Sequence, residues 1–158
     1  MQAVIVGEAL NHRSDLQKRI AQLQERLRGS VLVQEGDEPP ESPDELLLEL
    51  ESLCGELQTL IAQLNHTNAR TTLSTGETVT EGLARRDVLA LRQGALRTAV
   101  RAATSDGLPF SRYSRSEIRM VRQIRVGDVQ ARLDALAKER RELDTLLQEH
   151  NWTTPMLE

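Results

Sequence analysis

The stretch LLLELESLCGELQTLIAQL (residues 46–64) repeats leucine at alternating steps of four and three residues. The stretch VQARLDALAKERRELDTLL (residues 129–147) keeps the same register, with Arg140 as its one polar member. Such spacing places a narrow apolar seam along one side of an α-helix, and long helices bury these seams against other helices. The sequence therefore predicts a mainly α-helical protein, built as antiparallel helical hairpins or a bundle.

Two further segments have a helical apolar pattern. Residues 3–28 repeat apolar side chains at the same steps ahead of Gly29, and residues 81–104 have a wider, less regular apolar face. Ser42 and Pro43 form a serine N-cap followed by a proline in the first helical turn, which marks a helix start. We expect helices over residues 3–28, 43–67, 81–104 and 129–150.

The segment between the first two helices has a different composition. Residues 34–45 (QEGDEPPESPDE) contain six acidic residues, three prolines and no basic residue. Such a segment has little apolar surface to bury, so we expect an exposed, mobile connector. A connector of this length lets the two helices fold back as an antiparallel hairpin.

Two segments predict a small β element between the second and fourth helices. Residues 69–79 are rich in β-branched side chains around the turn signal Ser74-Thr75-Gly76, which indicates a short β-hairpin. Residues 117–126 alternate between two faces, one of them largely apolar, and are interpreted as a strand that could pair with this hairpin in a short sheet. A helix is the alternative for this second segment, because it would align several arginines on one face.

Composition limits the classes of function. The chain has 158 residues, a net charge of −4, 2% aromatic residues and one cysteine. This is the size of one helical domain, expected over residues 1–158, and the acidic balance argues against simple non-specific nucleic-acid binding by the whole chain. No phosphate-binding glycine loop or nucleophile motif is present, so we expect no cofactor and favour a non-enzymatic role. The lack of a signal sequence and of a membrane-spanning stretch predicts a cytoplasmic protein.

Two clusters of polar residues are candidate ligand sites. Glu8, His12 and Asp15 follow i, i+4, i+7 spacing, so they share one helix face and could supply metal ligands. A second cluster lies at the end of the second helix and the start of the third, where it could converge into an anion- or ligand-binding site. A purely structural network is the alternative for this second cluster, which comprises Asn65, Asn68, Arg85, Arg86 and Asp87.

The densest basic stretch of the chain is a third candidate. Arginines at this density could bind the phosphates of RNA or DNA, but Tyr113 is the one aromatic residue inside the stretch that could stack on a base. Salt bridges with the acidic first half of the chain are favoured over nucleic-acid binding. The stretch comprises Arg112, Arg115, Arg119, Arg122 and Arg125.

Several sequence blocks spread over nearly the whole chain carry a family resemblance. The opening block is EAL…RSDLQKRIAQL (residues 8–23), and the closing block is ELDTLLQEHNWTT (residues 142–154). Together the blocks resemble the septicolysin-like family of small bacterial proteins, most of which have no established function. The blocks between these two are VQEGDEP (33–39), LNHTNART (64–71), LARRDVLALR (83–92) and RYSRSEI (112–118).

The resemblance implies a mostly helical cytosolic protein that self-associates, and it brings no catalytic residues. The family name suggests a thiol-dependent pore-forming cytolysin, but the sequence lacks the long amphipathic β-hairpins that such an activity needs. We therefore expect a structural or interaction module that forms a homo-oligomer, a dimer or larger. A nucleic-acid-associated protein, and a ligand- or metal-binding protein or enzyme, are the alternatives.

Overall fold

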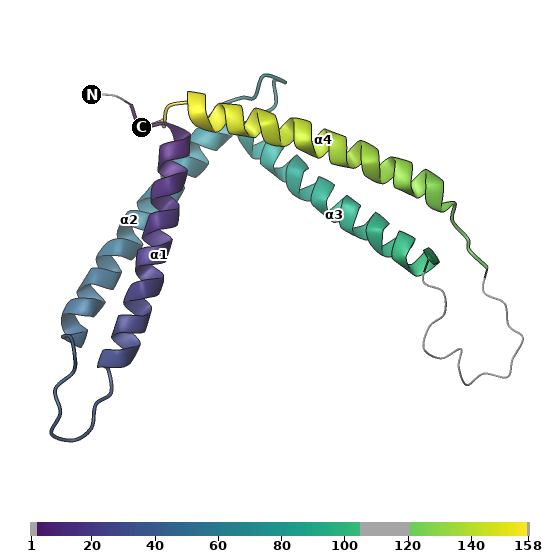
Figure 1. The fold of residues 1–158 in the computed structure, drawn as a ribbon. Helices are drawn as coiled ribbons and strands as arrows, with labels where there is room; N and C mark the ends of the chain where they lie inside the picture. Colours follow the sequence, from purple (N-terminus) through teal and green to yellow (C-terminus); the bar gives the residue numbers. More distant parts are fainter. Residues whose placement is uncertain (1–2, 105–120, 158) are drawn as a thin grey trace, which may run out of the picture. The chain divides into compact units, whose positions relative to one another are not determined.

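The structure, a computed structural model, describes residues 3–104 and 121–157 and is dominated by four helices (Figure 1). Contacts divide the chain into two compact units, Met1–Thr80 with Gln148–Glu158, and Glu81–Leu147. No helix of the described part is long and apolar enough to cross a bilayer. The helices are α1 (Val6–Ser30), α2 (Pro43–Arg70), α3 (Val79–Thr104) and α4 (Val126–Thr153).

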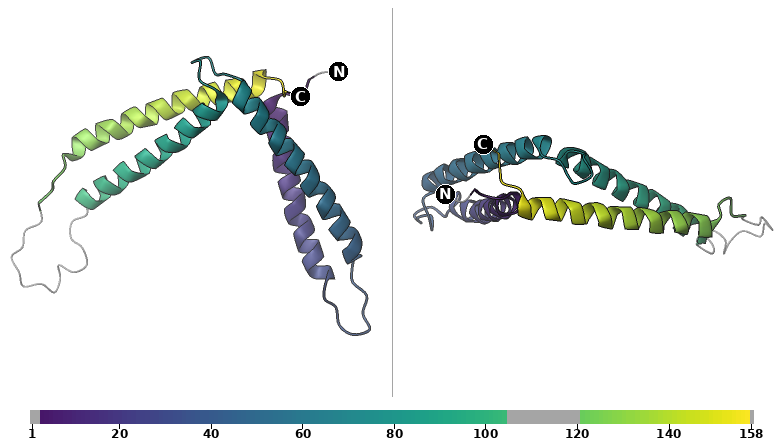
Figure 2. Two further views of the ribbon diagram at one scale, coloured as in Figure 1. Left: turned by 180° about the vertical axis from the view of Figure 1, so that it is seen from behind. Right: turned by 90° about the horizontal axis from the view of Figure 1, so that it is seen from above.

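In the first unit, α1 and α2 form an antiparallel hairpin and lie side by side along their length (Figures 1 and 2). The core of this hairpin is the predicted leucine seam, which confirms the helical interpretation of both segments. Leu16 and Leu23 of α1 are at most 1% exposed and pack with the buried Leu46 and Leu53 of α2. Partly buried side chains complete the seam, namely Ile20, Leu27, Leu50, Leu57 and Leu60.

The start of α2 follows the predicted capping chemistry. The Ser42 hydroxyl accepts a hydrogen bond from the Glu45 backbone N–H at 3.4 Å, and Pro43 is the first helical residue. The residues before this cap are held to α1 by Arg26, whose guanidinium pairs with Glu41 and lies 3.5 Å from Glu49. The Arg26 hydrogen bond lowers the pKa of the exposed Glu41 carboxyl.

In the second unit, α3 and the main part of α4 also lie side by side (Figure 2). Leu89 of α3 and Leu143 of α4 are at most 2% exposed, so they form part of the apolar interior. An ion pair of 3.4 Å joins Arg85 of α3 to Glu139 of α4. Both pairs of helices therefore match the predicted hairpin architecture.

The β-hairpin predicted over residues 69–79 is not formed. Its residues contribute one isolated bridge pair, Thr72 with Thr78, because helices occupy the flanking positions up to Arg70 and from Val79. Between them the chain makes a tight turn in which Gly76 has a φ of 89°, and too few residues are left for strands. The β-branched residues serve the helix ends instead: the Thr71 N–H closes α2 on the Thr67 carbonyl at 3.0 Å.

The strand predicted over residues 117–126 is not formed in its described part either. Residues 121–125 form no strand, and residues 117–120 lie outside the described residues. Val126 already belongs to α4, three residues before the predicted start. The carbonyl of Arg125 accepts hydrogen bonds from the Asp128 and Val129 N–H groups, so the first helical turn uses groups that a strand would have needed.

Candidate functional site

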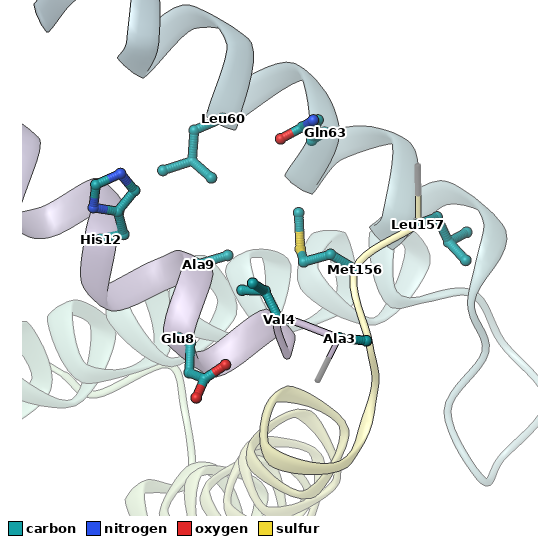
Figure 3. Close-up of a pocket in the computed structure, with 9 residues that line it drawn as sticks. All are labelled: Ala3, Val4, Glu8, Ala9, His12, Leu60, Gln63, Met156 and Leu157. Carbon is teal, nitrogen blue, oxygen red and sulfur yellow. The ribbon is translucent and has the colours of Figure 1, made fainter. Parts of the chain in front are cut away.

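A groove of about 720 Å³ lies at the end of the α1–α2 hairpin where the two chain ends meet (Figure 3). Glu8, Ala9 and His12 of α1 form one side, and Leu60 and Gln63 of α2 form the other. Residues before α1 and after α4 complete the lining. These are Ala3, Val4, Met156 and Leu157.

His12 and Glu56 form the polar centre of this side of the hairpin. Their atoms Nε2 and Oε1 are 2.8 Å apart, and both side chains are about half exposed. Because an ionised carboxylate only accepts hydrogen bonds, the His12 Nε2 carries the proton that joins the pair. A second hollow of about 430 Å³ adjoins the groove and shares His12, Leu60 and Gln63 with it, so the two run together along the hairpin.

The segment after α4 forms one wall of the groove and is fastened by backbone hydrogen bonds. The Val6 N–H donates to the Thr154 carbonyl at 2.9 Å, and the Met156 N–H donates to the Val4 carbonyl at 2.8 Å. Thr67 of α2 is fully buried, and its hydroxyl accepts the Leu157 N–H at 3.1 Å. A side chain in the middle of the sequence thus positions the last described residue of the wall.

His150 joins the end of α4 to the end of α2. The single hydroxyl proton of Thr71 is donated to the Thr67 carbonyl at 2.8 Å, so the His150 Nε2, 2.9 Å from the Thr71 oxygen, is the donor of that second bond. Within the described part of the chain, the buried His150 Nδ1 has no hydrogen-bond partner. Burial lowers the pKa of His150 below its ordinary value of 6.5, because the charged form loses its hydration.

Gly7 allows the end of α4 to approach α1 closely. A Cβ at this position would lie 3.0 Å from the Asn151 carbonyl oxygen and 3.0 Å from Cε3 of Trp152. The first of these neighbours is backbone and cannot rotate away. The absence of a side chain at Gly7 therefore allows the close contact that supports the groove wall.

The three residues of the predicted metal site have separate partners. Glu8 accepts the Ile5 N–H at 3.1 Å, His12 pairs with Glu56, and Asp15 lies 3.4 Å from Lys18. Among the described residues, no three His, Cys, Asp or Glu side chains are grouped as metal ligands. Glu8 and His12 instead line the groove, and their helical spacing did not predict this position.

The members of the predicted ligand cluster fall into the two units. Asn65 and Asn68 lie on α2, in the first unit, and the buried Asn68 Oδ1 has no hydrogen-bond partner among the residues that the structure describes. Arg85, Arg86 and Asp87 lie on α3, in the second unit, where Arg85 pairs with Glu139 and Arg86 pairs with its neighbour at 3.3 Å. Their convergence stays a prediction.

The predicted basic stretch is described in part. Arg112, Arg115 and Arg119 lie outside the described residues. Arg122 donates from Nε to the Ala103 carbonyl at 2.6 Å, which ties the residues before α4 to the end of α3. Arg125 is exposed.

The outer face of α3 is an apolar surface that was not predicted from the sequence. Val88 is 52% exposed and Leu91 is 73% exposed, although both lie in the middle of a long helix. They belong to a second register with steps of four and three residues, on the side of α3 away from its buried residues. We call this surface the outer α3 stripe, and every member is exposed: Ala84, Val88, Leu91, Ala95, Thr98 and Ala102.

Of the comparisons with known proteins, one supports the fold and none assigns an activity. The profile of DUF6847, a family of unknown function, matches residues 13–156. A crystal structure of a functionally unknown conserved protein from Corynebacterium diphtheriae is similar over 99% of this chain and 100% of that one. The two are 36% identical in sequence, with a TM-score of 0.87. No match was found among the curated proteins.

Proposed function

Since the chain belongs to the family of unknown function DUF6847, we propose from its own geometry that it is a non-enzymatic interaction module that self-associates. The observation that carries the proposal is the outer α3 stripe. Leu91 exposes 73% of its surface although the same helix buries Leu89, two residues earlier, to 2%. A repeating row of apolar residues on a long helix is the pattern that packs against a second helix.

The occupant that we propose for this stripe is α2 of a second copy of the chain. Exposed residues of α2 repeat at steps of four and three on the side away from its seam, from Leu48 through Gly55 to Ala62. Leu48 is 72% exposed, and nothing lies within 4 Å of a Cβ built on Gly55, so another helix can approach closely here.

Charge supports this pairing of unlike helices. The described charges of α3 are five arginines against Glu81 and Asp87, whereas α2 carries five acidic residues against Arg70. Two copies of α3 would repel each other, but α3 of one copy and α2 of another attract. The pairing therefore favours a contact between unlike faces of two copies.

Light scattering on protein eluting from a size-exclusion column tests the proposal. We expect the full chain to elute as an oligomer, and the double substitution Val88→Gln with Leu91→Gln to weaken association by about tenfold or more, because two exposed aliphatic side chains leave the interface. Leu48→Gln is expected to weaken it as well, since it lies on the opposing face. Leu32→Gln is the matched control, because Leu32 is 87% exposed but lies outside both faces.

Two results would overturn the proposal. The first is a wild-type chain that stays monomeric at all concentrations tested, and the second is an oligomer unchanged by the double substitution. The resemblance to the septicolysin-like family and the nucleic-acid alternative stay predictions. Binding of RNA or DNA that weakens with salt and is lost when Arg119, Arg122 and Arg125 become alanine would favour that alternative.

A further inference from the structure

The groove of the first unit has a lining with two chemical parts. Its floor and far wall are aliphatic or thioether, from Val4, Ala9, Leu60 and Met156. Glu8 and His12 of α1 also line it, with the Glu8 carboxylate accepting the Ile5 N–H and Glu56 bound to His12 in the adjoining hollow. Of the residues that the structure describes, no lysine or arginine contributes to the lining of either hollow.

We propose that this groove binds a small amphiphile with an elongated apolar body and a positively charged head, of the alkylammonium class. The apolar floor favours the body, since transfer of each methylene from water contributes about 0.8 kcal/mol when fully buried. Two carboxylates beside a half-exposed histidine favour a cation over an anion as the head. The site does not depend on the outer α3 stripe, which lies in the other unit.

The shape of the groove favours an elongated body over a compact one. The hollow of about 720 Å³ is within the size range of small-molecule sites and continues past His12 into the hollow of about 430 Å³. Met156 has an unbranched side chain that adapts to different occupants. Because Met156 is placed by the hydrogen bonds of the groove wall, the site is formed before a ligand arrives.

Calorimetric titration of the full chain with octylammonium tests the proposal, and octanoate and octanol serve as matched probes. We expect saturable binding of one octylammonium per chain, weaker binding of octanol, and the weakest binding of octanoate. Glu8→Gln is expected to reduce octylammonium affinity by about fivefold, the effect of one nearby charge in a solvated site. It is expected to leave octanol binding unchanged.

A filled-groove variant locates the binding. Gln63 is exposed and lines both hollows, so Gln63→Trp places an indole in the groove and is expected to abolish binding. Gln22→Trp is the control, since Gln22 is exposed on the same hairpin but lines neither hollow. Circular dichroism of both variants checks that the helices are intact.

Three results would overturn the proposal. They are no saturable binding of octylammonium, octanoate binding as tightly as octylammonium, and binding that survives Gln63→Trp in a folded protein. Gly55 belongs both to the α2 face proposed for self-association and to the adjoining hollow, so the titrations are repeated on the Val88→Gln and Leu91→Gln double variant. Octylammonium binding is expected to be the same in this variant as in the wild type, which distinguishes failure of this proposal from failure of the proposed function.

Discussion

In the α1–α2 hairpin, one register of apolar side chains per helix is buried between the helices, and the opposite face of α2 has mostly small or polar residues. In α3, two registers are present, of which one is buried with Leu89 and the other leaves Val88 and Leu91 exposed. Both hairpins thus have the same periodic pattern of apolar residues, but they differ in how many of these residues are buried. Periodicity alone predicts a helix, whereas the number of apolar faces on that helix indicates how many neighbours it needs.

The largest expected effect is a difference in unfolding free energy between alanine substitutions at two leucines of α3, one buried and one exposed. Leu89→Ala is expected to lower the free energy of unfolding by about 2–5 kcal/mol, because it leaves a cavity at a buried position. Leu91→Ala is expected to change it by less than about 0.5 kcal/mol in the monomer, since its side chain is mostly in water. Urea denaturation of both variants in the Val88→Gln background, at low protein concentration, measures the difference. Equal losses would remove the distinction between the two faces.

The next effect tests how the first unit is completed. Thr67→Val keeps the shape of the side chain but removes the acceptor of the Leu157 N–H, and we expect it to cost about 1–3 kcal/mol of unfolding free energy. Amide hydrogen exchange near Leu157 is expected to accelerate while the α3–α4 hairpin keeps its protection. Thr59→Val is the control, because the exposed Thr59 hydroxyl bonds only within α2, to the Gly55 carbonyl. Uniform loss of protection in both units would contradict the division.

A smaller effect depends on pH. The folded-state pKa of His150 is lowered, so this residue contributes stability that is fully present above about pH 6.5 and is lost as the pH falls toward the folded-state pKa, because the unfolded chain takes up the proton first. Urea denaturation at pH 7.5 and 5.5 is expected to show a fall in unfolding free energy that is reduced in His150→Gln. His66→Gln is expected to keep the wild-type fall, and an equal reduction in both variants would count against the assignment.

The smallest expected effect is at Arg140, the polar member of the α4 register. Its guanidinium lies 3.8 Å from Asp144 one turn away, and both side chains are about 40–50% exposed. Such a pair contributes about 0.3–0.5 kcal/mol, so Arg140→Leu is expected to shift the free energy of unfolding only slightly. A gain of more than about 2 kcal/mol, measured by denaturation, would show that the position is covered in solution.

The local rules predicted the helices well, because each rule concerns residues within a few positions of one another. Ser42 caps α2 as expected, and the leucine seams of α1 and α2 meet as expected. The prediction of a β-hairpin over residues 69–79 was wrong, because β-branched composition does not show how many of these residues the flanking helices will include. Thr71 is the C-cap of α2, and Val79 is the first residue of α3, so only a short turn is left between the two helices.

The candidate site could be predicted only in fragments. His12 and Glu8 were chosen for their helical spacing, but their partners in the structure include Glu56, which is 44 residues from His12. The contact of Thr67 with Leu157 spans 90 residues and has no periodic signature in the sequence. The outer α3 stripe, in contrast, is visible in the sequence as a second register, and testing every register of each helix would have found it.

The first unit is discontinuous in the sequence, since it combines Met1–Thr80 with Gln148–Glu158. During synthesis the α1–α2 hairpin can form early, because its contacts are local, but the bonds from Thr67, Val6 and Val4 must wait for residues 154–157 to leave the ribosome. The α3–α4 hairpin emerges before that closing segment. The nascent chain therefore carries an incomplete groove until residues 154–157 are translated, and these four residues set the last step in the folding of the first unit.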